Sequence, residues 1–160
     1  MKNLENTKPL IRVAGYSDIE GLLNLGKIFH EYAELGKWGL GYSREGFAQV
    51  LAKCMNNPAL RVFVAEIDGV VAGSIAGTIS PWFLDPNQLN AAEQWWIVDP
   101  KYRGGPLAFD LLAALEAWAV QMGAKVMCVA GFSEKRIGAL GRLYRRKGYL
   151  GLETHFVKEL

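Results

Sequence analysis

The chain has few of the residues that mark a metal site or a disulfide framework. It contains two cysteines and two histidines among its 160 residues. Cys54 and Cys128 both lie within apolar patterns, which predicts buried, reduced thiols rather than a disulfide. His30 and His155 match no metal-ligand spacing, so the sequence predicts no metal site.

Long hydrophobic runs and strong charge are also missing. The first ten residues, MKNLENTKPL, lack the apolar core of a signal peptide, and no stretch is long and apolar enough to span a bilayer. The formal net charge of +2 provides no basic surface of the kind that nucleic acid requires. We therefore expect a cytoplasmic protein that binds neither membrane nor nucleic acid.

Apolar residues are what the chain has in quantity: they make up 51% of it, against 21% charged residues. This is enough for a packed core and too much for a disordered chain. The length fits one domain of ordinary size, and neither a repeat nor a linker interrupts it. Residues 1–160 are predicted to form a single domain.

The first elements are a strand and two helices. Residues 10–15 alternate like a short strand. The sequence SDIE that follows is a capping-box motif, in which Ser17 and Glu20 would satisfy the first amides of a helix. Ser43 is placed to cap a second helix, which Pro58 ends.

Three strands are predicted in the middle of the chain. Residues 61–80 read as two strands around Asp68-Gly69, the strongest short hairpin signal. The sequence SPWFLDP is expected to break the second of them. The run AAEQWWIV at 91–98 is a further strand, and strict alternation puts three of its residues on one face: Glu93, Trp95 and Ile97.

The second half continues as helix, strand, helix, strand. A helix over 107–122 has an apolar stripe, and the apolar run at 125–130 is typical of a strand buried on both faces. A last helix lies between Ser133 and Gly148, and 152–160 alternates as a final strand. A helical crossover predicts a parallel strand pair, whereas the first half favours antiparallel pairing.

The turn RGGP at 103–106 directly precedes a helix. Free amides at a helix N-terminus, together with glycines that carry no side chain, form an anion site. Arg103 adds a fork of donors suited to phosphate. A tight connection with Pro106 as a first-turn residue explains the same sequence, so both interpretations are open on these residues alone.

This segment resembles the acyl-CoA loop of the GNAT superfamily of N-acetyltransferases. The family motif is Arg or Gln, two residues, Gly, one residue, then Gly or Ala, and Arg103 and Ala108 match its ends. The sequence LYRRKGYL at 143–150 is similar to the tyrosine-and-glycine ending of the family's last major helix. The element order matches over the whole chain, and EQWWIVDPKYRGG is similar to a branch common in tailed phages.

Two positions depart from the family pattern. Pro106 stands where the motif has its central glycine, and proline has no amide to donate. Ile137 stands where many members have an asparagine that contacts CoA. Backbone amides are still offered by Gly105, Leu107 and Ala108. The resemblance therefore implies a CoA site, and its affinity for CoA is left open.

The resemblance implies an α/β fold with a mixed, mostly antiparallel, twisted sheet that contains one parallel strand pair and is flanked by about four helices. It implies an acetyl-CoA-dependent N-acetyltransferase that moves the acetyl group to a primary amine by direct transfer in a ternary complex. The residues implied to contact CoA are Ile97, Val98, Arg103, Gly104, Gly105, Leu107 and Ala108.

Two side chains are candidates for the chemistry. Glu93 lies in apolar company, where a carboxylate is either satisfied by hydrogen bonds or acts as a base. A half-exposed strand residue is the alternative. The resemblance places Tyr144 as the general acid for the departing thiolate, and the alternative is a core tyrosine.

The acceptor amine is not identified by the sequence, and it is either a small molecule or a protein. The resemblance implies that two loops with aromatic residues form the acceptor pocket. Three candidates for its lining are Trp38, Tyr42 and Trp82. The sequence leaves open whether the protein forms a homodimer. The alternative function is a non-catalytic interaction module with a degraded CoA site, and a longer acyl-CoA is a third hypothesis.

Overall fold

The structure, a computed structural model, describes residues 8–130, 137–152 and 158. Five strands form one sheet in the order β1-β2-β3-β4-β5. These are β1 (Leu10–Val13), β2 (Leu60–Ile67), β3 (Val70–Trp82), β4 (Asp85–Val98) and β5 (Ala124–Cys128). The helices of the described part are α1 (Ile19–Tyr32), α2 (Arg44–Asn56), α3 (Leu107–Gln121) and α4 (Ile137–Arg146).

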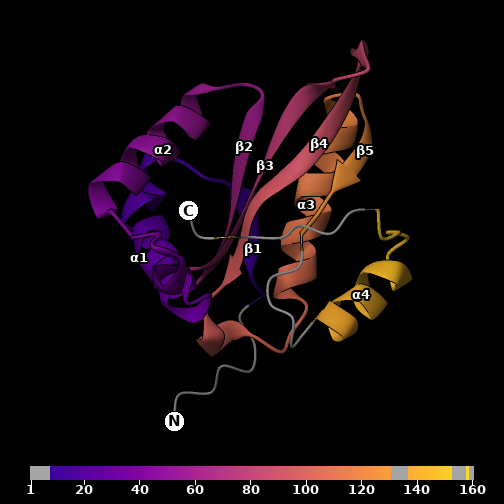
Figure 1. The fold of residues 1–160 in the computed structure, drawn as a ribbon. Helices are drawn as coiled ribbons and strands as arrows, with labels where there is room; N and C mark the ends of the chain where they lie inside the picture. The colour runs from indigo at the N-terminus through magenta and orange to yellow at the C-terminus, as the bar shows by residue number, and fades with distance from the viewer. Residues whose placement is uncertain (1–7, 131–136, 153–157, 159–160) are drawn as a thin grey trace.

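The sheet is covered by helices on both faces. Helices α1 and α2 lie on one face, and α3 lies on the other with α4 beside it (Figure 1). Strands β1 to β4 pair antiparallel, and β4 and β5 pair parallel. The predicted fold class is therefore confirmed. Most of the predicted last strand at 152–160, together with the predicted cap Ser133, lies outside the described residues.

Several local signals act as predicted. Asp68 and Gly69 have φ angles of 51° and 75°, and they join β2 to β3. Positive φ at both central residues gives a turn whose twist matches the strands, because glycine and aspartate tolerate this region best. The Ser43 hydroxyl accepts from the Gly46 N–H at 3.0 Å and caps α2.

The predicted capping box at the start of α1 is wrong. A 3₁₀ turn precedes the helix, and the Asp18 carboxylate, not Ser17, accepts from the Gly15 N–H at 2.7 Å. Asp18 also binds the guanidinium of Arg12. This ion pair is stronger than a neutral cap, and it sets how the chain enters the helix. Glu20 has no part in it.

The segment SPWFLDP ends the strand as expected, but the turn lies at Phe83 and Leu84 rather than directly after Ser80. Strand β3 continues through Pro81 to Trp82, which pairs with Asp85 at the start of β4. A register shift between Pro81 and Trp82 absorbs the proline, whose missing N–H is tolerated at such an irregularity. The result is a long hairpin that projects beyond the rest of the sheet at the top of Figure 1.

A β-bulge changes the expected alternation of β4. Ala76 of β3 pairs with Trp95, but the next residue, Gly77, pairs with Glu93, which leaves Gln94 as an extra residue. Glu93 and Trp95 thus pair with adjacent residues of β3, so the predicted shared face is wrong. A bulge of this kind re-aims a side chain and commonly lies beside a functional site.

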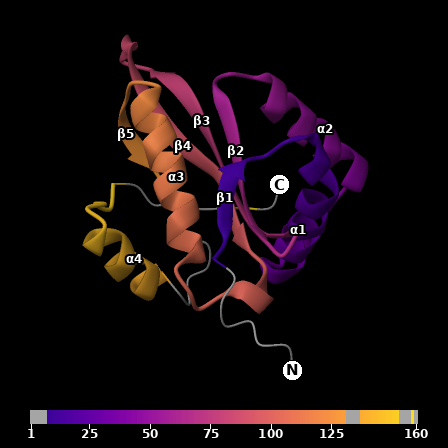
Figure 2. The same ribbon diagram turned by 180° about the vertical axis from the view of Figure 1, so that it is seen from behind.

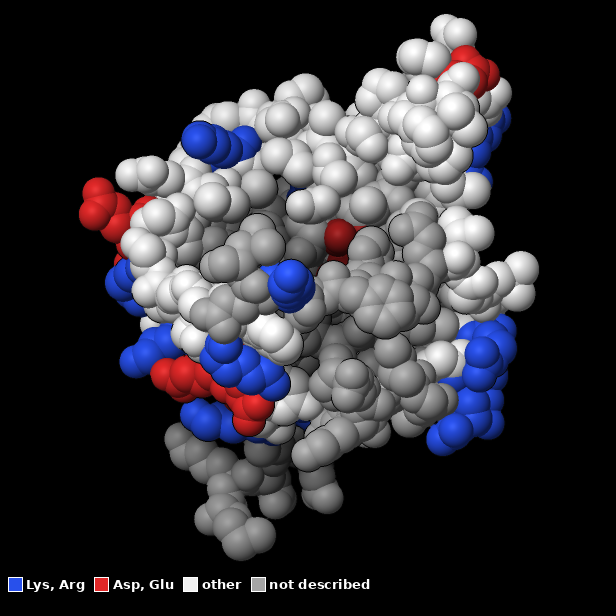
Figure 3. Space-filling view, in the orientation of Figure 1, with Lys and Arg blue, Asp and Glu red and all other residues white. Residues whose placement is uncertain are grey.

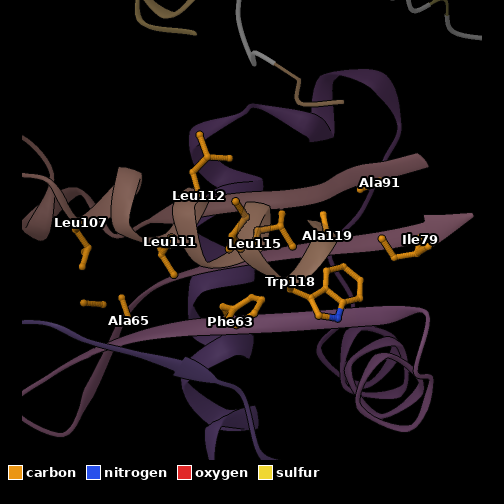
Figure 4. Packing of buried hydrophobic residues seen from close by; sticks show 12 residues of the cluster. Phe63, Ala65, Ile79, Ala91, Leu107, Leu111, Leu112, Leu115, Trp118 and Ala119 are labelled. Carbon is orange, nitrogen blue, oxygen red and sulfur yellow. The ribbon is translucent and has the colours of Figure 1, made fainter. Parts of the chain in front are cut away.

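The core has one part on each face of the sheet. On the α3 side, Ile75, Leu111 and Leu115 are fully buried, within the cluster shown in Figure 4. On the α1–α2 side, Leu22 and Leu51 are equally buried. Each such side chain contributes about 1.5–3 kcal/mol through burial. Helices therefore cover both faces of β2 and β3.

Strand β5 is more exposed than its apolar sequence predicts. Lys125, Val126 and Cys128 are exposed, so the expectation of a strand buried on both faces is wrong. Its described partner is β4 alone, because β5 lies at the end of the strand order. Cys54 is buried as predicted, but Cys128 is not; both are free thiols.

Candidate active site

The site lies where β4 and β5 separate. The parallel pairing runs from Leu89 to Ala92 of β4, opposite residues 124–128. Beyond Ala92, the described part of the chain shows β4 paired with β3 along one edge, up to Val98. Within the described residues, no strand pairs with the other edge of β4 beyond Ala92, and an edge of this kind suits a ligand that binds as an added strand does.

Glu93 and Tyr144, the two candidates for catalysis, meet at Ala130. The Ala130 N–H donates to Glu93 Oε2 at 3.0 Å, and the Tyr144 hydroxyl donates to the Ala130 carbonyl at 3.1 Å. The bonds connect β4, the segment after β5, and α4. The structure therefore brings together two residues that are 51 positions apart in sequence, through a backbone residue that the sequence analysis did not identify.

Burial shifts the pKa of both groups. It raises the pKa of the Glu93 carboxyl, and the hydrogen bond from Ala130 offsets part of this rise. Burial and the nearby charge of Glu93 raise the pKa of Tyr144 to about 12. Tyr144 thus keeps its proton near neutral pH, and Glu93 holds a proton more strongly than an exposed carboxyl does. One group suits a proton donor and the other a proton acceptor.

Aromatic rings surround Tyr144. The ring of Trp96 lies 6.2 Å from it and that of Tyr149 lies 5.6 Å from it, centroid to centroid. Phe109 packs edge-on against Trp96 at 6.4 Å. The Tyr149 hydroxyl donates to Glu116 at 2.6 Å. This packing leaves Tyr144 half-buried.

The glycine turn is open to solvent. Gly104 has a φ of +96°, a backbone conformation that favours glycine, and a Cβ at Gly104 or Gly105 would meet nothing within 4 Å. Both residues are exposed. A ligand can therefore approach this backbone closely, as the anion-site interpretation requires.

Pro106 is the N-cap of α3 rather than a residue of its first turn. Its φ is −73°, and its carbonyl accepts from the N–H groups of Phe109 and Asp110 at 2.8 and 3.0 Å. The amides of Leu107 and Ala108 therefore precede the first helical hydrogen bond, where the helix dipole is positive. The expected position was wrong by one residue, because proline's φ suits the N-cap here as well.

Two contacts place Arg103 beside this turn. Its Nε donates to the Val98 carbonyl at 2.9 Å, and its guanidinium lies 4.3 Å from the ring centroid of Tyr32. Arginine over an aromatic face is held by cation–π attraction. The end of β4, the glycine turn and the end of α1 are thus joined. One of the Val98 groups predicted to contact CoA already binds Arg103.

Tyr42 is one of three candidates for the acceptor pocket, and it lies between α1 and α2. Its hydroxyl donates to the Leu23 carbonyl at 2.7 Å, and burial raises its pKa. Its ring packs at 6.4 Å against Phe47, which packs at 5.7 Å against Trp95. An aromatic row thus runs from Tyr42 to β4, one residue beyond the bulge.

The structure does not bring the other two candidates to this row. Trp38 ends the 3₁₀ turn that follows α1, with Lys37 over its ring. The ring of Trp82 packs at a tilt against that of Phe83 at the hairpin tip. It lies five residues along β3 from Gly77, the partner of Glu93. At about 3.3 Å per residue, that is roughly 17 Å along the strand. Of the three candidates, Tyr42 is the one that belongs to this aromatic row, and the acceptor role of each stays a prediction.

The face that carries α1, α2 and β5 is hollowed at its centre, with acidic atoms set back from the surface (Figure 3). Lys and Arg side chains lie mainly toward its margins. Within the described residues, no His, Cys, Asp and Glu side chains group in a way that would hold a metal ion. The same residues include no helix with the length and apolar character to cross a membrane.

A sequence model of the acetyltransferase (GNAT) family matches residues 27–149. The molecule is thus of the acetyltransferase class, and the match spans the glycine turn, Glu93 and Tyr144. The chain belongs to the GNAT acetyltransferase family, as its sequence motifs predicted. Acetyl-CoA is the co-substrate of this family, which agrees with the predicted cofactor. The relation to a phage branch stays a prediction.

Solved structures share the fold. An acetyltransferase of Trypanosoma brucei is 21% identical with a TM-score of 0.73, over 96% of this chain and 100% of that one. The aminoglycoside N-acetyltransferase AAC(6')-Iy in complex with CoA is 17% identical with a TM-score of 0.78, over 97% and 96%. The aminoglycoside acetyltransferase meta-AAC0020, from an uncultured soil metagenomic sample and in complex with sisomicin, is 17% identical with a TM-score of 0.72, over 95% and 96%. Comparison with curated proteins finds no significant match.

Proposed function

We propose that the protein is an N-acetyltransferase that moves the acetyl group of acetyl-CoA directly to a primary amine in a ternary complex. The observation that carries this proposal is the pair of hydrogen bonds through which Glu93 and Tyr144 meet at Ala130. They lie where β4 and β5 part, with one proton acceptor and one proton donor of raised pKa.

The residues near the end of β4 fit the co-substrate. The open turn, the charge of Arg103 and the first amides of α3 suit phosphate groups, and the edge of β4 suits an extended amide chain. The co-substrate supplies an acetyl group already activated as a thioester. The residues that would hold it are Ile97, Val98, Arg103, Gly104, Gly105, Leu107 and Ala108.

Glu93 and Tyr144 would divide the proton transfers. A bond forms between the amine nitrogen and the acetyl carbon, and the carbon–sulfur bond breaks. Glu93 takes the proton that the amine loses, directly or through one water, and Tyr144 gives a proton to the sulfur. The Tyr144 hydroxyl must turn away from the Ala130 carbonyl to do so, which a single side-chain rotation allows.

The acceptor that we propose is a small amine whose remaining groups are apolar or cationic. The row Tyr42–Phe47–Trp95 approaches β4 from the α1–α2 side, and aromatic faces bind apolar groups and cations alike. Two of the similar structures are aminoglycoside acetyltransferases, so sisomicin belongs in the first panel of amines. Release of the CoA thiol measures turnover with each amine.

Calorimetry with acetyl-CoA is the first test. We expect binding, and we expect Arg103→Ala to weaken it by roughly 1.5–3 kcal/mol, or roughly 10- to 150-fold, as for hydrogen bonds to charged groups. Arg44→Ala is the matched control, because it removes an exposed arginine that pairs with Glu20 on α1. Absence of binding at millimolar acetyl-CoA would contradict the proposal and favour a non-catalytic module.

A further inference from the structure

We propose that Tyr149 and Glu116 position the hydroxyl of Tyr144 for proton donation to the sulfur. This inference rests on the proposed function, and it adds two residues to which the sequence analysis gave no role. Helix α4, which carries Tyr144, lies beside α3, which carries Glu116, in both Figure 1 and Figure 2. The turn after α4 and one hydrogen bond to α3 connect the three side chains.

The turn after α4 places Tyr149 against Tyr144. The Tyr149 N–H donates to the Tyr144 carbonyl at 3.0 Å, and the Gly148 N–H donates to the Arg145 carbonyl at 3.1 Å. Gly148 has a φ of +89°, in the left-handed region that favours glycine. These two bonds and this φ define a Schellman motif, in which the residue after the glycine folds back over the last turn of the helix. The rings of Tyr149 and Tyr144 accordingly lie 5.6 Å apart, centroid to centroid.

A hydrogen bond to α3 holds Tyr149 in this place. Its hydroxyl donates to Glu116 Oε1 at 2.6 Å, and its ring packs against the buried cluster on the α3 side of the sheet. Burial and the bond to Glu116 raise the pKa of Tyr149, so its hydroxyl remains the donor near neutral pH. Glu116 follows Leu115, which is fully buried, so the acceptor belongs to a well-packed part of α3.

A second contact joins the same turn to α3, but it is weaker. The Lys147 ammonium lies 5.4 Å from the ring centroid of Phe109. Phe109 and Glu116 are about two helical turns apart and therefore lie on one face of α3. Lys147 is exposed, and an exposed cation–π contact contributes little, whereas a hydrogen bond to a carboxylate in a partly buried place is strong. The bond between Tyr149 and Glu116 therefore does most to fix the turn.

This support matters because Tyr144 has to leave its own hydrogen bond to act. Its hydroxyl donates to the Ala130 carbonyl and must turn away from it to reach the sulfur. Among the described residues, the rings beside Tyr144 are then Trp96 at 6.2 Å and Tyr149 at 5.6 Å. Tyr149 thus keeps the ring of Tyr144 in place while the hydroxyl changes its partner.

The first test is the turnover of Tyr149→Phe, which keeps the ring and removes the bond to Glu116. With acetyl-CoA and the amine of the panel that is acetylated fastest, we expect kcat to fall roughly 10-fold, less than the ~10²-fold that a misplacement of about 1 Å can cost. The KM for acetyl-CoA should not change. Tyr16→Phe is the matched control, because it removes an exposed hydroxyl that accepts from Asn56. An unchanged kcat in Tyr149→Phe would overturn the inference.

The acceptor is tested on Glu116. Glu116→Ala removes the acceptor and should lower kcat as Tyr149→Phe does, and the two changes together should lower it no further. Glu116→Gln keeps an acceptor oxygen for the Tyr149 hydroxyl and should lose less than Glu116→Ala. Equal losses in the alanine and glutamine variants would contradict a role for this hydrogen bond.

A double-mutant cycle separates positioning from a general loss of structure. A residue that acts through Tyr144 has nothing to position once that hydroxyl is gone, so Tyr149→Phe should not lower kcat further in the Tyr144→Phe background. A residue that only maintains the fold lowers kcat by the same factor in both backgrounds. That second result would make Tyr149 a packing residue.

NMR of the full chain with ¹³C-labelled tyrosine gives a readout that does not need turnover. Tyr144→Phe assigns the ring signals of Tyr144 among the six tyrosines. Glu116→Ala leaves both tyrosine rings in the chain, and we expect it to shift the Tyr144 signals, because the distance to the Trp96 ring changes. Glu45→Ala, at an exposed glutamate of α2, is the control and should leave them in place.

The two proposals fail separately. A wild-type protein that binds no acetyl-CoA contradicts the proposed function, whatever the tyrosine signals show. Tyr144 signals that are the same in Glu116→Ala and in the wild type contradict the positioning role, even in an active enzyme.

Discussion

Two carboxylates of this protein, Asp18 and Glu93, are held in opposite ways. Asp18 accepts from both terminal nitrogens of Arg12, at 2.7 and 2.8 Å, and from the Gly15 N–H. Glu93 accepts from the backbone N–H of Ala130. The hydrogen bonds from Arg12 lower the pKa of Asp18, whereas burial raises the pKa of Glu93.

The difference indicates that Asp18 stabilises the fold, and it supports the proposed role of Glu93 in proton transfer. Arg12 also binds Glu66, so this ion cluster joins β1, the start of α1 and β2. Within the described residues no cation pairs with Glu93. A carboxylate whose charge is already balanced has little affinity for a proton, and a buried one without a cation gains affinity.

The largest expected effect is on turnover by Tyr144→Phe. If Tyr144 protonates the departing sulfur, its loss should lower the rate by roughly 10²–10⁴-fold, the usual range for general acid catalysis. Acetyl-CoA affinity should change little, because the ring and its packing remain. Steady-state kinetics together with calorimetry check this, and an unchanged rate would assign Tyr144 to the core.

Breaking the ion cluster should have the largest effect on stability. Arg12→Met leaves the Asp18 carboxylate, 5% exposed, without its cation, and we expect a loss of about 3 kcal/mol in the free energy of unfolding. Lys27→Met is the control, since its pair with Glu31 is exposed and should contribute a few tenths of a kcal/mol, about the value for such pairs. Denaturant unfolding measures both, and equal losses would contradict the role of Asp18.

Substitution of Glu93 sharpens the comparison, because it should not lower the free energy of unfolding as Arg12→Met does. Glu93→Gln keeps an oxygen for the Ala130 N–H and removes a buried charge, so the protein should be as stable as the wild type or more stable by up to about 1 kcal/mol at pH 8. Turnover should fall, and the defect should shrink as pH rises, since the solution then supplies neutral amine. A defect independent of pH would speak against Glu93 as the base.

The pH dependence of stability follows from the same two groups. The folded pKa of Asp18 is lowered, so its stabilising contribution is complete above the unfolded value of about 4 and is lost as pH falls through the folded pKa. The folded pKa of Glu93 is raised, so its unfavourable contribution grows as pH rises through that value. Melting temperatures from pH 3 to 8 should show less acid loss in Asp18→Asn than in the wild type.

The smallest expected effect is that of Pro106→Gly, which changes a backbone donor rather than a side-chain partner. Pro106→Gly adds an N–H at the N-cap of α3 but gives the unfolded chain more freedom, which lowers stability by about 0.4–1 kcal/mol. We expect tighter acetyl-CoA binding and a lower melting temperature without ligand. Lower stability with unchanged affinity would mean that the turn is only a connection.

Much of this architecture was predictable because its signals are local. Asp68-Gly69 predicts a hairpin through the φ angles that these residues tolerate, and Ser43 predicts a helix start through one side-chain bond. The spacing from Arg103 to Ala108 predicts the family through residues close together in the chain. Glu93 and Tyr144 were singled out in the same way, although their roles stay predictions.

Contacts between distant segments were not predictable from these signals. Alternation along β4 placed Glu93 with Trp95, but pairing with β3 inserts a bulge that separates them. Asp18 displaced the expected Ser17 cap because Arg12, on another element, was there to pair with it. The apolar character of 125–130 predicted burial for Cys128, yet the place of β5 in the strand order left it exposed.

By itself, the sequence determined the order of the elements, the glycine turn and the candidate residues, since each depends on local backbone preference or on a short spacing. The tertiary structure alone decided that Glu93 and Tyr144 meet at one backbone residue, and that a bulge separates Glu93 from Trp95. The physical reason is that a hydrogen-bond partner and the burial of a charge depend on which distant segments pack together. Residue type and periodicity do not contain that information.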